Sequence, residues 1–342
     1  MSKLTDVWEI FKEVDTRPLA AQAERPIFLA IVGARYAGKS TLIHALSFNA
    51  KPDERNVPPA IELTLDESAR AQDADFLILV LDATRTEFSA EAKFFREWND
   101  SDKRALIYYN KTDLAHDANQ LGATLLQWKG APTAFGSALD PLSLDREFVP
   151  RVLAALPEES LALARNFPIF RRAVARALVS DTARANAMYT LGTGVAEIIP
   201  VLDLPLNAAD ILVLTKNQAL LIYKLGLALG LSTRWEDHLA EFGGAVGVGF
   251  LWRQIARQLV GLIPVIGIAP KVAIAYAGTV ALGEAILFWY QTGKKISGQG
   301  MREMYANALA RGKVIAHELM THTPRGGAPK KLKSGRKWLN RA

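Results

Sequence analysis

A short segment, Gly33-Ala34-Arg35-Tyr36-Ala37-Gly38-Lys39-Ser40, has the pattern G-x-x-x-x-G-K-S. Its glycines let the backbone curl until successive N–H groups point inward and form a site for an anion. In such a loop Lys39 would reach the β and γ phosphates of a nucleotide, and the Ser40 hydroxyl would bind Mg²⁺. We therefore predict phosphate binding by residues 33–40 and Thr41, with Lys39 and Ser40 as the catalytic pair. An ordinary glycine-rich turn is the alternative.

The surrounding sequence would position this loop correctly. A continuous apolar run at 27–32, typical of a parallel strand buried on both faces, precedes the loop, and helix-forming sequence follows it from 40 to about 47. Two more buried-strand runs lie at 76–81 and 105–109, with a helical stretch at 89–98 between them. This alternation predicts an α/β fold, a doubly wound and mostly parallel sheet with ligands at the carboxyl ends of its strands.

The segment after the 105–109 strand, Asn110-Lys111-Thr112-Asp113, resembles the N-K-x-D motif of Ras-like P-loop GTPases. A carboxylate accepts two hydrogen bonds, so Asp113 can pair with the two adjacent N–H donors of guanine, whereas adenine has no such edge. The resemblance implies that the stem of Lys111 lies along the base and that Asn110 ties this loop to the phosphate loop. It implies GTP or GDP as the ligand, together with Mg²⁺.

Two further features extend the resemblance over roughly residues 26–156. Ser137-Ala138 resembles the family's S-A loop, in which a backbone amide contacts guanine, although a plain surface turn is the alternative. The run from Asp73 to Ala83 is similar to the fourth strand of the Era/TrmE-like branch.

The family's switch motifs are not visible. The interval 47–75 has no glycine and no threonine before Thr64, so neither the usual first-switch threonine nor a D-x-x-G is present, and a β-hairpin of ordinary length does not fit. The best substitute for a second-switch metal ligand is Asp66, at the end of a possible strand, with a solvated turn acid as the alternative. No residue can be named as the group that positions water.

The second half of the chain has long apolar helical stretches. The run from Val272 to Tyr290 has Glu284 as its only charge and is the one credible membrane-spanning candidate. A central glutamate favours a partner inside a helix bundle over exposure to lipid. A soluble bundle with an apolar core, inserted hairpins and a peripheral amphipathic surface all remain open.

Blocks at 214–218 and 250–259, with Ile-Pro-Val turns at 199–201 and 263–265, resemble the bacterial domain of unknown function numbered 697. The paired turns also suggest an internal repeat. This family is often fused behind Era-like GTPases and is regarded as membrane-associated. The resemblance implies a membrane or membrane-protein partner at the cytoplasmic face, and no catalytic role for this half.

Composition and charge exclude some classes of site and partner. The chain of 342 residues has no cysteine, so disulfides and thiolate metal sites are impossible. Its net charge is +6, but seven of the positive charges follow Thr323, so the rest of the chain carries a net charge of −1. We therefore do not expect nucleic-acid binding. The N-terminus is not of the secretory type, which favours a cytosolic compartment. The basic tail would favour an anionic membrane or simply aid solubility.

These observations predict four parts: an amphipathic helix and linker (1–25), a GTP-binding domain (26–157), a hydrophobic, all-α helical domain (158–320) and a flexible basic tail (321–342). The first helix would pack on the body or contact a membrane or partner. The predicted function is a slow GTPase switch coupled to the helical domain. The alternative is a nucleotide-binding scaffold with degenerate switches and little hydrolysis.

Overall fold

The computed structural model describes residues 15–47, 60–99, 104–115, 128, 130–196, 208–235, 237, 268–294 and 296–322. The predicted N-terminal helix up to residue 14, the Ile-Pro-Val turns, the block at 250–259 and the basic tail from 323 lie outside these residues, as does most of the interval between the phosphate loop and Ala60.

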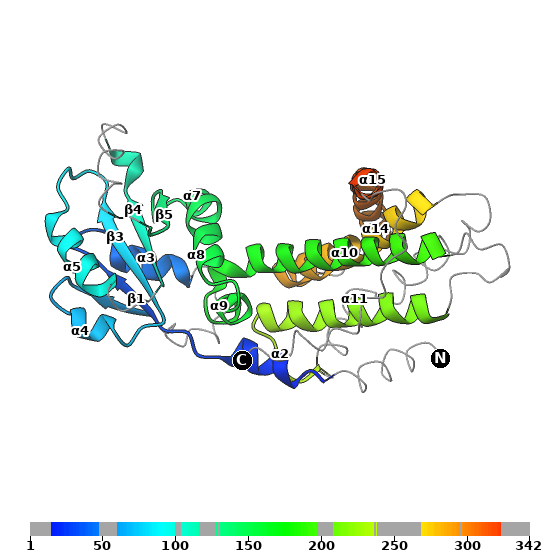
Figure 1. The fold of residues 1–342 in the computed structure, drawn as a ribbon, viewed down its shortest axis with the longest axis horizontal. Coiled ribbons are helices and arrows are strands. Elements are labelled where there is room, and N and C mark those ends of the chain that lie inside the picture. Colours follow the sequence, from blue (N-terminus) through cyan, green and yellow to red (C-terminus); the bar gives the residue numbers. More distant parts are fainter. Residues whose placement is uncertain are drawn as a thin grey trace. The chain divides into compact units, whose positions relative to one another are not determined.

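The elements alternate between strands and helices in the first half and are helical afterwards (Figure 1). In chain order they are α2 (Arg17–Glu24), β1 (Leu29–Val32), α3 (Lys39–Leu46), β2 (Ala60–Leu63), α4 (Ser68–Ala71), β3 (Phe76–Asp82), α5 (Ser89–Asn99), β4 (Arg104–Asn110), η2 (Thr112–Leu114), β5 (Thr133–Phe135), α7 (Pro141–Ser143), η4 (Leu144–Phe148), α8 (Val149–Ala155), α9 (Ser160–Asn166), η5 (Pro168–Phe170), α10 (Arg171–Ala196), α11 (Ala208–Ala228), α14 (Ile268–Thr292) and α15 (Gly298–His322).

Contacts divide the chain into two compact units. The first, called the sheet unit below, comprises Asp15–Ala177 and Lys224–Trp235. The second, called the helical unit, contains Leu178–Tyr223 and the described residues from 237 onward. Residues 158–177, assigned from sequence to the helical domain, are therefore grouped with the sheet.

The sheet unit contains five parallel strands in the order β2-β1-β3-β4-β5. The predicted α/β fold with a parallel sheet is confirmed. β1 is buried along its whole length, and β3 and β4 are buried at six of their seven positions, as expected for strands covered on both faces. β2 pairs in parallel with β1.

Helices cover both faces of this sheet (Figure 1). On one face, Leu77, Leu79 and Leu81 of β3 belong to the same buried cluster as the aromatic side chains of α5. On the other face, the ring of Tyr108 in β4 meets that of Phe148 edge-on, with 5.2 Å between their centroids. The alternation of side chains along a strand produces these two cores.

In the helical unit, α14 is the central apolar element. Fourteen of its residues are buried, and buried Met301, Tyr305, Ala308 and Ala316 recur along α15 at helical spacing. Glu284 of α14 has a partner, since Arg311 Nη2 of α15 lies 2.6 Å from its Oε1. The expectation that this glutamate has a partner on another helix agrees with that contact, and the Arg311 side chain is itself exposed.

Two buried polar side chains and a half-buried one join three helices of this unit. Asn186 Nδ2 of α10 donates to Thr279 Oγ1 of α14 at 2.9 Å, and Asn217 Nδ2 of α11 donates to Asn186 Oδ1 at 2.7 Å. Within the described residues, α14 is the one helix long and apolar enough to span a membrane, and 78% of its most apolar window is buried. A core helix of a soluble protein has the same properties.

Candidate nucleotide-binding site

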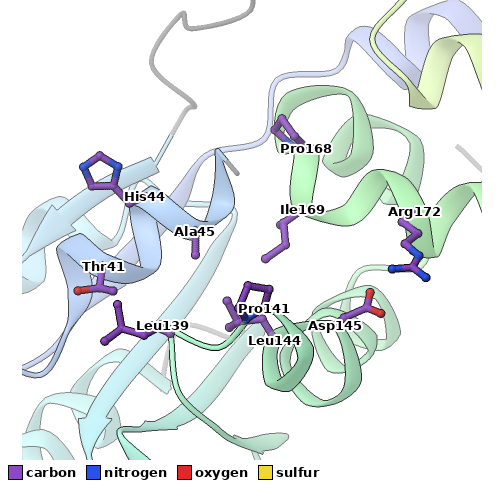
Figure 2. A pocket seen from close by; sticks show the side chains of 11 residues that line it. Thr41, His44, Ala45, Leu139, Pro141, Leu144, Asp145, Pro168, Ile169 and Arg172 are labelled. Atoms are coloured by element: carbon purple, nitrogen blue, oxygen red, sulfur yellow. The ribbon is translucent and has the colours of Figure 1, made fainter. Parts of the chain in front are cut away.

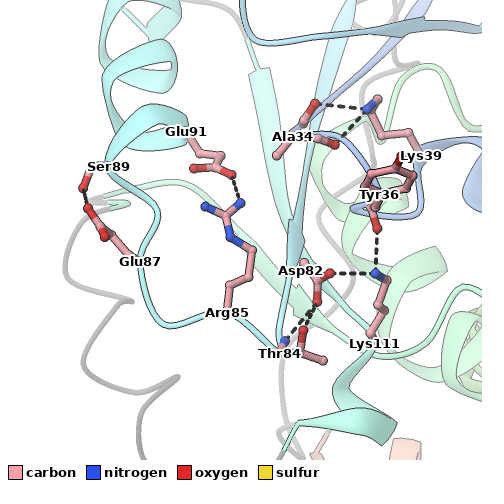
Figure 3. Close-up of polar contacts among 11 residues, drawn as sticks. Ala34, Tyr36, Lys39, Asp82, Thr84, Arg85, Glu87, Ser89, Glu91 and Lys111 are labelled. Atoms are coloured by element: carbon pink, nitrogen blue, oxygen red, sulfur yellow. Dashed lines mark hydrogen bonds and ion pairs between the residues drawn. The ribbon is translucent and has the colours of Figure 1, made fainter.

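The predicted phosphate loop lies between β1 and α3, at the carboxyl end of the sheet. Gly38 has φ 94°, and a side chain there would collide with the Asn110 amide, so only glycine fits. Lys39 is buried, and its Nζ donates to the carbonyl oxygens of Gly33 at 3.1 Å and Ala34 at 2.9 Å (Figure 3). The loop thus holds its cation in place with its own backbone.

Asn110, at the end of β4, connects three loops. Its Nδ2 donates to the Ala37 carbonyl at 2.8 Å, and its Oδ1 accepts from the Ala138 backbone N–H at 2.8 Å. Asn110 itself is buried. One side chain therefore fixes the phosphate loop, the Asn110–Asp113 segment and the Ser137-Ala138 loop relative to one another. The structure brings together the three segments that the sequence singled out.

Lys111 makes the second connection between the loops. Its Nζ donates to the Tyr36 carbonyl at 2.6 Å and lies 2.6 Å from Asp82 Oδ2 (Figure 3). Burial on its own would raise the pKa of the Asp82 carboxyl, but hydrogen bonds from Lys111 and Thr84 hold that pKa below its usual value. The ammonium group therefore faces an ionised partner and is anchored between the two loops.

The residues predicted to contact the base lie next to this junction. Asp113 is exposed in the short helix η2, with its carboxylate open to a ligand. Ser137 and Ala138 are buried, and the Thr112 N–H donates to the Gly136 carbonyl at 3.2 Å. The two loops that would flank a base are thus bonded directly to each other.

A carboxylate that the sequence did not single out contacts the phosphate loop. Ser40 Oγ donates to Glu62 Oε2 at 2.7 Å, and Lys39 Nζ lies 3.7 Å from Glu62 Oε1. Glu62 belongs to β2, where Leu63 belongs to the core on the α5 side of the sheet. Because side chains alternate along a strand, Glu62 faces the opposite side, toward α3.

The structure places Asp66 in an exposed turn after β2. A hydrogen bond from the Thr64 side chain lowers the pKa of its carboxyl. Ser40 bonds to Glu62 instead, so Glu62 is the acid that lies beside the predicted metal ligand. The assignment of Asp66 to Mg²⁺ stays a prediction.

Two arginines near the loop have different surroundings. Arg35 is exposed. Arg85 Nη1 lies 2.9 Å from Glu91 Oε1 (Figure 3). Its guanidinium is 5.8 Å from the centre of the Phe88 ring. Arg85 is therefore held against α5 by an ion pair with a buried glutamate.

A cavity of about 400 Å³ adjoins the predicted site (Figure 2). One wall comes from α3, including Thr41, and another from the segment that starts at Ala138, so two predicted ligand-binding residues line it. Ile169 and Arg172, from η5 and the start of α10, form a third wall. Open space is thus present beside both the helix after the phosphate loop and the predicted base loop.

Sequence reasoning missed Glu62 and Asp82. The signal for Glu62 would have been the alternation Ile61-Glu62-Leu63, which places one acid on the face opposite two apolar residues. Asp82 is the last residue of a buried strand, where parallel sheets present their ligand-binding groups.

Neither a protein-family model nor a curated protein sequence matches this chain. The structural class of the chain is given by its fold: in the described residues it is an α/β protein with a five-stranded parallel sheet and an additional helical unit.

Proposed function

We propose that this chain binds guanine nucleotide at the carboxyl end of its sheet. The observation that carries the proposal is the set of contacts made by Asn110 and Lys111, which hold the G-x-x-x-x-G-K-S loop and the N-K-x-D segment in one assembly. Phosphates would lie on the backbone N–H groups at the start of α3 with Lys39. The base would lie between the stem of Lys111 and the Ser137-Ala138 loop, with Asp113 at its edge.

Mg²⁺ fits this arrangement. The Ser40 hydroxyl and the Glu62 carboxylate supply the oxygen ligands that this ion prefers, either directly or through water. When bound, the ion would neutralise phosphate charge. Glu62 is the acid that we propose for this ion, because it lies beside both Ser40 and Lys39, and the assignment of Asp66 stays a prediction.

Glu62 also gives the proposal a test that involves the metal. Without Mg²⁺, its negative charge would oppose the phosphates, so GTP affinity in the wild type should rise strongly when Mg²⁺ is added. Glu62→Gln should bind GTP better than the wild type in EDTA and lose roughly tenfold of the Mg²⁺ effect. Lys39→Ala should bind weakly in both conditions. Equal GTP binding by Lys39→Ala and the wild type would refute phosphate binding at this loop.

Hydrolysis of the bound nucleotide is a proposal separate from nucleotide binding. We propose slow hydrolysis of GTP to GDP and phosphate, supported by Lys39 and Ser40 with Mg²⁺. The turn after β2 supports the alternative, a nucleotide-binding scaffold, because its Asp66 is exposed and bonds to Thr64, whereas Ser40 bonds to Glu62 of β2. Single-turnover release of phosphate separates the two functions. A rate no greater than that of Lys39→Ala would favour the scaffold.

The helical unit would carry the response to the bound nucleotide. We propose that it engages a membrane or a membrane protein at the cytoplasmic face and that the bound nucleotide changes this association. The apolar helix α14 and the resemblance of this half to a membrane-associated family support the proposal. Vesicle flotation in GDP and in a non-hydrolysable GTP analogue tests it, and identical flotation in both would contradict the coupling.

A further inference from the structure

Tyr36 has an unusual backbone conformation for its residue type. Its φ is 64°, and among the described residues the only other non-glycine residue with positive φ is Lys111, at 63°. L side chains rarely adopt this region, and bulky ones least of all. Such conformations persist where surrounding contacts impose them, and they are concentrated at functional sites.

The contacts that impose this conformation involve the backbone around Tyr36. The Tyr36 carbonyl accepts from Lys111 Nζ at 2.6 Å, and the next carbonyl, that of Ala37, accepts from Asn110 Nδ2 at 2.8 Å. Both donors come from the predicted base-reading segment. The left-handed turn is therefore set by the junction of the two loops, and the ring plays no part in these bonds.

The ring itself is almost fully exposed. Its exposed fraction is 86%, the highest among the exposed large hydrophobic side chains of the described residues. It therefore adds little packing energy to the empty protein. Glycine would adopt the same backbone without steric cost. A tyrosine at this position is explained more readily by a contact made when ligand is bound.

The position of Tyr36 between the two halves of the site indicates which part of the ligand it meets. In the proposed complex, phosphates lie at Lys39 and the base edge lies at Asp113. The side chain of Lys111 starts beside Asp113 and ends at the Tyr36 carbonyl, so Tyr36 lies at the far end of the base from Asp113. The sugar has to pass there to join base and phosphates.

We infer that the ring of Tyr36 packs over the ribose of the bound guanine nucleotide and shields it from water. The inference rests on the proposed function and extends it with a positioning residue. GDP and GTP share the ribose, so this contact would strengthen both equally and would slow their release. It would not distinguish the two nucleotides.

The test is Tyr36→Gly, a change that removes the ring and relieves the backbone. If the ring covers the ribose, affinity for GDP and for GTP falls by about tenfold each, and nucleotide dissociation becomes faster by a similar factor. Tyr36→Phe keeps the ring and should stay within about threefold of the wild type. Isothermal titration and stopped-flow release measure these quantities.

Inorganic tripolyphosphate separates a contact with the nucleoside from a change in loop shape. It engages the phosphate loop alone, so its affinity should be the same in Tyr36→Gly and the wild type. A parallel loss of tripolyphosphate and nucleotide binding overturns the inference, as does unchanged or tighter GDP binding by Tyr36→Gly, the result expected if the ring serves a protein partner. A wild type that binds neither GDP nor GTP overturns the proposed function, and this inference with it.

Discussion

At the scale of single residues, Asn110 holds the loops of the site together. Its amide donates to one loop and accepts from another, and all three segments are buried where they meet. Removal of this side chain leaves a buried carbonyl and a buried N–H without partners. Unmade hydrogen bonds in a buried site cost more than the bonds contribute when they are present.

We expect Asn110→Ala to destabilise the protein by about 2–4 kcal/mol and to weaken GTP binding by at least tenfold. Asn166→Ala is the matched control, because Asn166 is only half-buried and bonds within its own helix, to the Ala162 carbonyl at 2.9 Å. That change should cost less than about 1 kcal/mol. Urea unfolding followed by titration with GTP measures both effects, and similar losses for the two variants would contradict this role of Asn110.

Sequence motifs singled out the site residues that lie close together in one loop. The pattern around Lys39 and the tetrapeptide at Asn110 were sufficient to place these groups after two buried strands, β1 and β4, which β3 separates in the sheet. Glu62 was not predictable in this way, because its contact with Ser40 depends on the register Ile31↔Glu62 between β1 and β2. A shift of one residue would turn that carboxylate to the other face.

At the scale of elements, the buried strands were predicted closely. The apolar runs at 27–32, 76–81 and 105–109 correspond to β1, β3 and β4. β2 and β5 are short, at 60–63 and 133–135, and too few residues carry a periodic signal in them. The expected strand ending at Asp66 ends at Leu63, because the chain turns at Leu65 and Asp66.

Glu159, directly before α9, links elements of the sheet unit. It accepts from Arg104 Nη2 of β4 at 2.8 Å and lies 3.6 Å from Arg25 Nη1. Burial opposes ionisation, but the hydrogen bond and charge of Arg104, a backbone hydrogen bond and the charge of Arg25 together hold the pKa of the Glu159 carboxyl below its usual value of 4.5. A depressed folded pKa contributes stability above pH 4.5, and this contribution is lost as the pH falls through the folded pKa.

Glu159→Gln should therefore be less stable than the wild type at pH 7, by about 1–3 kcal/mol. The difference should shrink as the pH is lowered below the ordinary glutamate range, because the wild-type carboxyl then takes up a proton and becomes similar to the amide. Urea unfolding at neutral and acidic pH tests this. A difference in the free energy of unfolding between the two proteins that stays constant with pH would show that the charge of Glu159 does not contribute to stability.

Close approach of two helices defines the helical unit. A Cβ on Gly312 of α15 would lie 2.5 Å from the backbone oxygen of Ala273 in α14, which cannot move without shifting the helix. We expect Gly312→Ala to destabilise this unit by about 1–3 kcal/mol. Gly192→Ala in α10 is the control, since a Cβ there meets nothing within 4 Å, and it should stabilise by up to about 1 kcal/mol. Thermal unfolding of both variants measures the difference, and a neutral Gly312→Ala would mean that the helices are less closely packed.

At the scale of the whole molecule, two units with different chemistry share one chain. α10 begins in the sheet unit and continues into the helical unit, and α11 is divided between them as well. The pattern of apolar residues predicted the change from α/β to helical structure along the chain. The division between the two units comes later than residue 157, because α9 packs with α2 and η5 packs with α3, and both partners belong to the sheet unit. Hydrophobic patterns alone do not show which neighbouring element a helix packs against.

The membrane proposal leads to a prediction about the mode of association. The mostly buried helix α14 joins buried Asn186 of α10 through Thr279, a contact that suits a bundle core, and its half-buried Glu284 pairs with the exposed side chain of Arg311. We therefore expect a carbonate wash to extract the protein from isolated membranes. Retention in the membrane pellet, as for a control integral protein, would contradict peripheral attachment and indicate a spanning helix.

The central claim is that Asp113 selects guanine while the loop around Lys39 holds the phosphates. Isothermal titration of the wild type and Asp113→Ala with GTP and ATP tests it most directly. The account predicts that the wild type binds GTP at least a hundredfold more tightly than ATP, and that Asp113→Ala loses most of this preference by weakening GTP binding alone. Equal binding of the two nucleotides by the wild type, or binding of neither, would contradict the account.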